Sequence, residues 1–291
     1  MRKIDGRTRT CGLIGNPVEH TLSPLIHNTL AEHMEHNLVY VPFRVENDLV
    51  GEAVKGAYAL NVLGMNVTVP HKSAVLPYLE EVDELAGKIG AVNTLVRCEN
   101  GYKGYNTDMT GLKRAMESDA VHLEGEKVIL LGAGGAARAV AFLCVHAGAE
   151  RVYLLNRTRE RAEAVAEEVN RAFDKEVIVP MLLHEYREIP EGKYLAIQGT
   201  SVGLDPDTES AVIMEDAFYE KVHTGYDLIY RPFRTKFMRL VEEHGGKAYN
   251  GLKMLAYQGI HAYELWNGVS VSEVQANEII QKMKEEMGIH E

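Results

Sequence analysis

The sequence has little cysteine: only Cys11, Cys98 and Cys144, which are odd in number and scattered along the chain. Cysteines that form a disulfide framework or a thiolate metal site are normally more numerous and regularly spaced. The chain therefore indicates neither, and we expect no bound metal. Few unpaired cysteines fit a reducing compartment, so a cytoplasmic protein is predicted.

Long hydrophobic runs and net positive charge are also absent. The basic residues within the first nine positions are not followed by an apolar run, so no signal peptide is predicted. The longest apolar region is interrupted by Arg138 and His146 and alternates strand with helix, which is not typical of a membrane span. A net charge of −11 argues against nucleic acid or a membrane as partner. Local arginines can still bind a small anion.

What the sequence does contain is typical of a globular α/β protein. A length of 291 residues suggests about two domains, and the 46% apolar and 25% charged content is ordinary. We place the domain changes near 108/109 and 248/249. Residues 109–248 form one predicted domain, and the apolar faces of the segment 249–291 predict that it docks back onto residues 1–108.

The clearest motif is a glycine turn within residues 127–143, KVILLGAGGAARAVAFL. A β-favouring run leads into G-x-G-x-x-A and then into an apolar helix. Gly132 allows a sharp turn, Gly134 lets a phosphate approach the backbone, and Ala137 allows close helix–strand packing. A second strand, 151–157, follows at βαβ spacing. The pattern favours a dinucleotide site over a plain tight turn.

The end of the second strand indicates which dinucleotide is bound. An NAD site usually has Asp or Glu here for the ribose 2′-hydroxyl. This chain instead has a polar and basic run, namely Asn156, Arg157, Thr158, Arg159 and Arg161. Guanidinium groups bind phosphate oxygens in a bidentate way, so NADP is favoured over NAD. The alternative is a solvated first helical turn balanced by neighbouring glutamates.

Two features of the N-terminal half suggest anion binding and proton transfer. Thr21 and Ser23 lie at a helix start before Pro24, where both hydroxyls can face one anion such as a carboxylate. Plain N-capping by Ser23 is the simpler interpretation. The stretch 64–72 is predicted to be a strand that ends at Pro70, and Lys72 lies just past this end, a position where α/β proteins bind ligands. A lone lysine is more often only a solvated charge.

A predicted hairpin places Asp108 in the same half of the chain. Asn100-Gly101 is typical of a type I′ turn between strands 91–96 and 102–106. Asp108 follows, where it could simply cap a helix from Met109 to Glu117. The remaining expected elements are strands at 38–45, 177–182, 194–199 and 225–230, and helices at 48–60, 158–173, from Leu252 onward and 272–287.

These stretches together resemble the shikimate dehydrogenase (shikimate/quinate dehydrogenase) family. The resemblance rests on motifs in family order, namely GNPVEHTLSP (15–24), NVTVPHK (66–72), GAVNTL (90–95), GYNTD (104–108), GAGGAAR (132–138), NRT (156–158) and YQG (257–259). It implies an N-terminal α/β substrate-binding domain and an NADP-binding Rossmann domain. It also implies that the active site is the cleft between them and that the C-terminal helices join the substrate domain.

The implied reaction is the reversible reduction of 3-dehydroshikimate to shikimate by NADPH in aromatic amino acid biosynthesis. Lys72 and Asp108 match the family's catalytic pair, and which of them moves the proton is left open. The matched substrate-binding residues are Thr21, Ser23, Thr68, Asn93, Asp108, Tyr230 and Gln258. The matched cofactor-binding residues are Gly132, Ala133, Gly134, Gly135, Ala136, Asn156, Arg157, Thr158, Arg161, Leu228 and Gly251.

Three departures from the family pattern bear on specificity. Thr21 stands where serine is usual, Met109 replaces a glycine, and Gln198-Gly199 replaces Asn-Thr or Asn-Ala. Because Lys72 and Asp108 are retained, we expect an active enzyme that prefers shikimate to quinate. The alternatives are a quinate or dual quinate/shikimate dehydrogenase using NAD(P), a non-catalytic NADP-binding regulatory protein, and a methylenetetrahydrofolate dehydrogenase. Either a monomer or a homodimer is compatible with the sequence.

Overall fold

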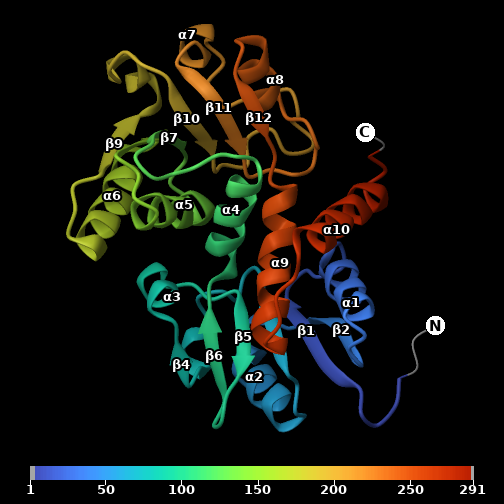
Figure 1. Cartoon of the computed structure of the whole chain (residues 1–291). Coiled ribbons are helices and arrows are strands. Elements are labelled where there is room, and N and C mark those ends of the chain that lie inside the picture. Colours follow the sequence, from blue (N-terminus) through green and yellow to red (C-terminus); the bar gives the residue numbers. More distant parts are fainter. Residues whose placement is uncertain (1–3, 290–291) are drawn as a thin grey trace. The chain divides into compact units, whose positions relative to one another are not determined.

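The computed structural model describes residues 4–289, which form two compact units. The first unit contains the chain up to Gly111 and again from Leu255 onward, and the second spans Leu112–Met254. Each unit is built on its own six-stranded sheet (Figure 1). The predicted α/β class is confirmed. The predicted domain boundaries at 108/109 and 248/249 stay a prediction.

The sheet of the first unit is mixed. Its order is β2-β1-β3-β5-β6-β4, with β1 parallel to both neighbours and β5 antiparallel to both of its own. The strands are β1 (Arg9–Gly15), β2 (Leu38–Arg44), β3 (Gly64–Val67), β4 (Glu81–Val82), β5 (Thr94–Arg97) and β6 (Tyr102–Tyr105). The carboxyl ends of β1 and β3 therefore lie side by side, where parallel strands present ligand-binding loops.

Helices cover this sheet. Those within the first unit are α1 (Ser23–His33), α2 (Val50–Ala59), α3 (Glu84–Ile89) and α10 (Glu273–Glu286), with short 3-10 turns η1 (Asn47–Leu49) and η2 (Leu76–Tyr78). Two further helices, α4 (Thr107–Ser118) and α9 (Leu252–Asn267), contain the boundaries between the units. The predicted last helix is confirmed, and Ser272 caps it with Gln275 in a capping box.

The second unit has the strand order of a dinucleotide-binding domain. Its sheet is parallel throughout in the order β12-β11-β10-β7-β8-β9, which is the doubly wound 3-2-1-4-5-6 arrangement read from the other edge. The strands are β7 (Lys127–Leu131), β8 (Arg151–Asn156), β9 (Ile178–Leu182), β10 (Tyr194–Gln198), β11 (Val222–Asp227) and β12 (Lys247–Tyr249). The Rossmann fold predicted from the glycine turn is confirmed.

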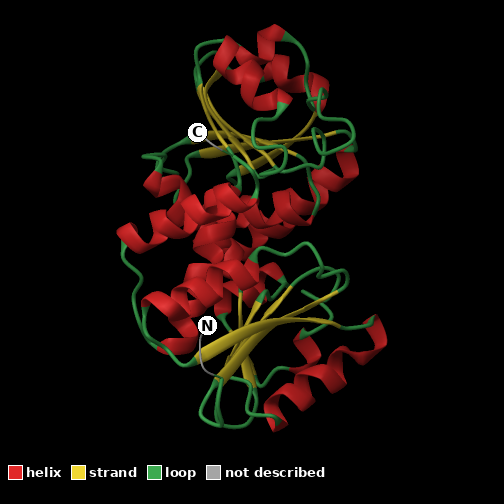
Figure 2. Cartoon of the chain, turned by 90° about the vertical axis from the view of Figure 1, so that its right-hand side faces the viewer, coloured by secondary structure: helices red, strands yellow, loops and turns green. Residues whose placement is uncertain are grey.

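The sequence of β7 explains its central place. The four residues from Val128 to Leu131 are completely buried. A continuous apolar run of this kind is typical of a parallel strand with helices on both faces. The helices of this unit are α5 (Gly135–His146), α6 (Arg159–Phe173), α7 (Asp216–Tyr219) and α8 (Lys236–Glu243), with the 3-10 turn η3 (Leu183–Glu188). Figure 2 shows helices packed on the strands of each sheet.

Two local predictions were wrong. The hairpin between β5 and β6 exists, but neither Asn100 nor Gly101 has a positive φ, so the turn is not type I′. A four-residue loop closes it instead, and the Cys98 N–H donates to the Gly101 carbonyl. Ser23 is also not an N-cap: α1 already includes it, and Leu22, which occupies the cap position, makes no side-chain hydrogen bond to the helix.

A close approach at Gly64 predicts a large loss of stability on substitution. The indole Nε1 of Trp266 donates to the Leu95 carbonyl at 2.8 Å, directly over Gly64. A Cβ on Gly64 would lie 2.7 Å from that carbonyl oxygen and would also overlap the indole. Gly64→Ala should therefore lower the free energy of unfolding by about 2 kcal/mol or more, measured by urea denaturation. Gly56→Ala, at an open helical position, is the control, and equal stability of the two variants would contradict the argument.

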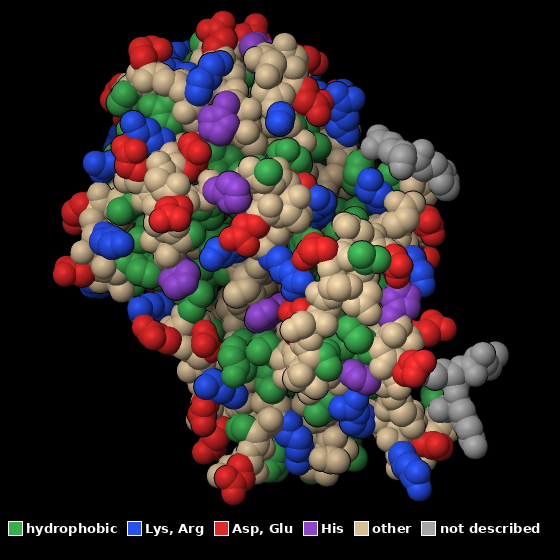
Figure 3. Space-filling model, viewed as in Figure 1, with side chains coloured by type: hydrophobic (Ala, Val, Ile, Leu, Met, Phe, Trp, Pro, Cys, Tyr) green, Lys and Arg blue, Asp and Glu red, His purple; other side chains and the backbone are tan. Residues whose placement is uncertain are grey.

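The surface carries charges of both signs. On the face shown in Figure 3, acidic and basic side chains are interspersed over the surface. Among residues 4–289, no helix is both long and apolar enough to cross a membrane.

Candidate active site

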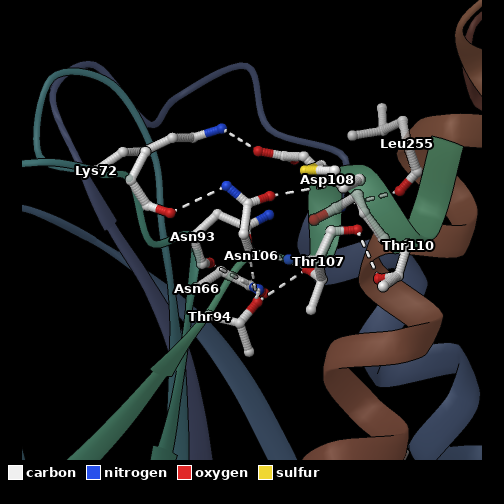
Figure 4. Close-up of polar contacts among 12 residues, drawn as sticks. Asn66, Lys72, Asn93, Thr94, Asn106, Thr107, Asp108, Thr110 and Leu255 are labelled. Carbon is white, nitrogen blue, oxygen red and sulfur yellow. Dashed lines mark hydrogen bonds and ion pairs between the residues drawn. The ribbon is translucent and has the colours of Figure 1, made fainter. Parts of the chain in front are cut away.

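Lys72 and Asp108 form an ion pair in the first unit. Lys72 lies just after a turn that follows β3, in which the His71 N–H donates to the Thr68 carbonyl. Asp108 lies in the first turn of α4. The Lys72 ammonium donates to Asp108 Oδ2 at 2.6 Å (Figure 4), and the two side chains are 33% and 21% exposed. The pair is therefore ordered yet accessible, as a proton-transfer group must be.

The start of α4 fixes the position of Asp108. The helix begins at Thr107, before the predicted Met109, so Asp108 lies inside its first turn. Asn106 acts as the cap: its Oδ1 accepts from the Met109 N–H at 3.4 Å, and its Nδ2 donates to the Ala91 carbonyl. The capping alternative for Asp108 is therefore wrong, and its carboxylate is available to bind Lys72.

Buried amides and hydroxyls support the pair from below (Figure 4). Asn93 Oδ1 accepts from the Thr107 N–H at 2.6 Å and from the hydroxyls of Thr94 and Thr107. With its oxygen fully used, Asn93 keeps its Nδ2 donors for a ligand. Asn66, which we did not predict as a site residue, donates to the Asn93 carbonyl and to Thr94. Its only signal in the sequence is a polar residue inside an apolar strand.

The predicted hydroxyl pair is formed. Thr21 Oγ1 donates to Ser23 Oγ at 3.0 Å and accepts from the Ser23 N–H at 3.2 Å. Thr21, and not Ser23, is therefore the residue that binds the backbone at this helix start. Ser23 is buried and Thr21 is partly exposed. Two adjacent hydroxyls at a helix N-terminus suit a small anion such as a carboxylate.

The other predicted substrate residues lie on both units. Thr68 follows β3, and Gln258 lies on α9, where its Nε2 donates to the Leu255 carbonyl at 2.9 Å. Gln258 keeps its side-chain oxygen for other partners. Tyr230 belongs to the second unit, where it lines a cavity. Their roles in binding substrate stay predictions.

The cavity of the second unit lies at the glycine turn and encloses about 1100 Å³. Gly132 has a φ of +106°, which only glycine adopts readily, and its missing Cβ makes room for Thr200 Cγ2. Gly134 occupies the N-cap of α5 and has no side chain to bind the first N–H groups of the helix, so these groups remain open to a ligand. A Cβ at Gly134 or Gly135 would meet nothing within 4 Å. These features fit a dinucleotide pyrophosphate.

The polar end of β8 also lines this cavity. Of the eleven predicted cofactor residues, nine border it: Gly132, Ala133, Gly134, Gly135, Ala136, Asn156, Arg157, Arg161 and Leu228. Arg157 and Arg161 are exposed, and no carboxylate pairs with either among residues 4–289. Arg159, in contrast, pairs with Glu185. The two free guanidinium groups suit the 2′-phosphate of NADP.

Two predicted cofactor residues do not border the cavity. Thr158 precedes α6, where its carbonyl accepts from Asn156 Nδ2 at 2.8 Å. Gly251 lies behind the wall, and its N–H donates to the Ile229 carbonyl at 3.0 Å. Sequence reasoning missed other wall residues, namely Leu183, Leu204, Ala211, Val212, Ile229 and Arg231. They come from loops after strands, whose ordinary composition carries no signal.

The parallel sheet, the glycine turn and the cavity, together with a lysine–carboxylate pair in the other unit, define an α/β oxidoreductase that uses a dinucleotide. Two family models match the chain: "Shikimate dehydrogenase substrate binding domain" at residues 13–95 and "Shikimate / quinate 5-dehydrogenase" at residues 114–187. The chain belongs to the shikimate dehydrogenase family.

Individual relatives agree with this assignment. A shikimate dehydrogenase (NADP+) of Desulforamulus reducens is 41% identical over 272 residues, covering 91% of this chain and 92% of the relative. A solved shikimate dehydrogenase in complex with NADP+ has a TM-score of 0.86 at 36% identity, covering 96% of this chain and 97% of that one. A shikimate 5-dehydrogenase of Listeria monocytogenes with shikimate and NAD has a TM-score of 0.90 at 28% identity, covering 97% and 99%.

Proposed function

We propose that the protein catalyses the reversible, NADPH-dependent reduction of 3-dehydroshikimate to shikimate in aromatic amino acid biosynthesis. The observation that carries this proposal is the Lys72–Asp108 pair, which is ordered at 2.6 Å and still accessible. The names of the family models and relatives, which include shikimate dehydrogenase (NADP+), support the same reaction.

The chain's own residues move the proton. Bound NADPH supplies the hydride that the carbonyl carbon receives. The carbonyl oxygen then needs a proton, and Lys72, which holds that oxygen through one ammonium N–H, donates it. Asp108 binds another ammonium N–H and so keeps Lys72 directed at the substrate. In the direction of shikimate oxidation the same transfer runs in reverse: the hydroxyl oxygen returns its proton to the Lys72 amine as the hydride leaves the carbon.

The polar side chains around the pair select a hydroxylated acid. We assign the substrate carboxylate to the hydroxyls of Thr21 and Ser23, with Tyr230 as a further donor. Thr68, Asn93 and Gln258 bind the ring hydroxyls, because each offers a donor or acceptor that no other residue among 4–289 uses. Each hydrogen bond that positions the ring also raises the specificity, since an analogue without that hydroxyl leaves a polar group unpaired.

The second unit holds the cofactor. The N–H groups at the start of α5 bind the pyrophosphate, and Arg157 and Arg161 bind the 2′-phosphate. Leu228 forms part of the cavity wall on the nicotinamide side. Asn156, in the position where NAD enzymes carry an acidic residue, offers no carboxylate to repel a phosphate. These contacts explain a preference for NADP.

Initial rates with shikimate or quinate, each combined with NADP+ or NAD+, test the proposal. We expect turnover with shikimate and NADP+ to exceed every other combination, by about a hundredfold over NAD+ because of the two arginines. Faster turnover of quinate with NAD+ would support the quinate dehydrogenase alternative. Binding of NADPH without any turnover would support a regulatory protein and overturn the proposal.

The compartment and the assembly are separate proposals. Cys11 and Cys144 are buried free thiols, and burial raises the pKa of each to about 12, so both resist oxidation. Unpaired thiols support a reducing, cytoplasmic location. Both a monomer and a homodimer remain compatible with the proposed reaction.

A further inference from the structure

Two buried polar side chains lie side by side under the cofactor cavity. Gln198 ends β10 and Asp227 ends β11, and the two residues are register partners in the parallel sheet. Both are fully buried. Gln198 Nε2 lies 3.4 Å from Asp227 Oδ1. They therefore occupy the carboxyl edge of the sheet, from which the loops of the cavity wall begin.

Asp227 organises the wall that follows β11. Its Oδ1 accepts from the Ile229 N–H at 3.0 Å, and its Oδ2 accepts from the Thr235 hydroxyl at 2.6 Å. Thr235 in turn caps α8 by accepting from the Met238 N–H. The segment between these anchors carries Leu228, Tyr230 and Arg231 of the cavity wall.

Gln198 organises the neighbouring wall, which follows β10. Its Oε1 accepts from the Thr200 N–H at 2.6 Å, and its Nε2 donates to the Val202 carbonyl at 3.1 Å. Thr200 lies against Gly132, where a Cβ would be only 2.7 Å from Thr200 Cγ2. Gln198 thus places the loop that packs on the glycine turn.

We propose that Gln198, Asp227 and Thr235 form a buried clamp that holds the two walls of the cofactor cavity in their NADPH-binding position. The inference deepens the proposed function, on which its link to turnover rests. None of the three residues needs to touch the cofactor: Gln198, Asp227 and Thr235 act as positioning residues through the backbone of Thr200, Ile229 and α8.

The charge of Asp227 gives the clamp a pH dependence. Burial raises the pKa of its carboxyl group to about 6, although the hydrogen bonds from Thr235 and Ile229 oppose this. The described groups that face it are these donors, Gln198 and the phenol of Tyr219 on α7, whose pKa the nearby carboxylate helps to raise. Above pH 6 the ionised carboxylate accepts from every donor. Below it, the added proton weakens the clamp.

NADPH affinity, measured by its fluorescence without shikimate, tests the clamp. Thr235→Val removes the hydroxyl but keeps the shape, and we expect the Kd for NADPH to rise about tenfold, with Thr235→Ser restoring it. The KM for NADP+ should rise equally, while the KM for shikimate stays unchanged. Thr224→Val makes the same change on β11, the strand of Asp227, where the hydroxyl instead contacts His223, and should leave the Kd unchanged.

Asp227→Asn tests the charge independently of the Thr235 variants. At pH 7.5 it should bind NADPH about tenfold more weakly than the wild type, because a neutral amide accepts from the donors less well. At pH 5.5 most of the wild-type carboxyl groups are protonated, so the difference should shrink to about threefold. Both proteins bind the same NADPH, so the titration of its 2′-phosphate changes both Kd values equally and cancels in their ratio.

The outcomes separate the clamp from the proposed reaction. Weaker NADPH binding in Thr235→Val and Asp227→Asn supports the clamp even if shikimate is not oxidised. The clamp would be overturned if a folded Asp227→Asn protein bound NADPH with wild-type affinity. It would also be overturned if the ratio of the Kd of this variant to that of the wild type did not change with pH. Either result would count even if shikimate is oxidised rapidly. An equal rise in both KM values would indicate a general structural defect and would also count against it.

Discussion

Replacing Lys72 with methionine is expected to lower kcat for shikimate oxidation about a thousandfold. Methionine keeps much of the length of the side chain but has no proton to give or take. The hydride step then proceeds without a positioned acid or base, and Asp108 loses its 2.6 Å partner. NADPH binding should not change, because the cavity that we propose as the cofactor site is lined by residues of the second unit.

Two further variants sharpen the Lys72 experiment. Lys88→Met is the matched control: Lys88 also pairs with a carboxylate, Glu84, but on the surface of α3, and its kcat should equal that of the wild type. Asp108→Asn keeps the shape at the partner position and should lower kcat less than Lys72→Met, since Lys72 remains present. A folded Lys72→Met enzyme with wild-type kcat would remove Lys72 from the mechanism.

The fold could be predicted largely because its central elements have simple local causes. The apolar run from Val128 to Leu131 followed by a glycine turn is typical of a buried parallel strand that leads into a helix. The structure places this strand in the middle of the parallel sheet. The turn at Asn100-Gly101 was predicted wrongly because the dipeptide does not fix the loop length, and four residues separate the two strands. The longer loop is closed by its own backbone hydrogen bond between Cys98 and Gly101.

The candidate site was predictable only in part. Family motifs point to Lys72 and Asp108, and the structure brings these residues together although they are 36 positions apart in the chain. The clamp of Gln198 and Asp227 could not be predicted, because it depends on the register between β10 and β11. A buried glutamine at the end of a strand has no signature of its own. The capping of α4 by Asn106 likewise depends on where the helix begins.

The arginines at the start of α6 carry the second large prediction. Replacing both Arg157 and Arg161 with alanine should raise the KM for NADP+ about a hundredfold, because the two exposed charge-assisted contacts with a phosphate together contribute about 3 kcal/mol. The KM for NAD+, which lacks the 2′-phosphate, should change little. The preference for NADP+ over NAD+ should therefore disappear.

The control for these substitutions lies on the same helix. Arg171 is near the end of α6, where it pairs with Glu167, and Arg171→Ala should keep the wild-type KM for both cofactors. Added salt should raise the KM of the wild type for NADP+, because screening weakens exposed guanidinium–phosphate contacts. The difference in KM between the wild type and the double variant should therefore shrink. If the double variant kept its preference for NADP+, another part of the cavity would have to recognise the 2′-phosphate. The exposed guanidinium groups would then be a solvated helix turn, which is the simpler alternative that the sequence left open.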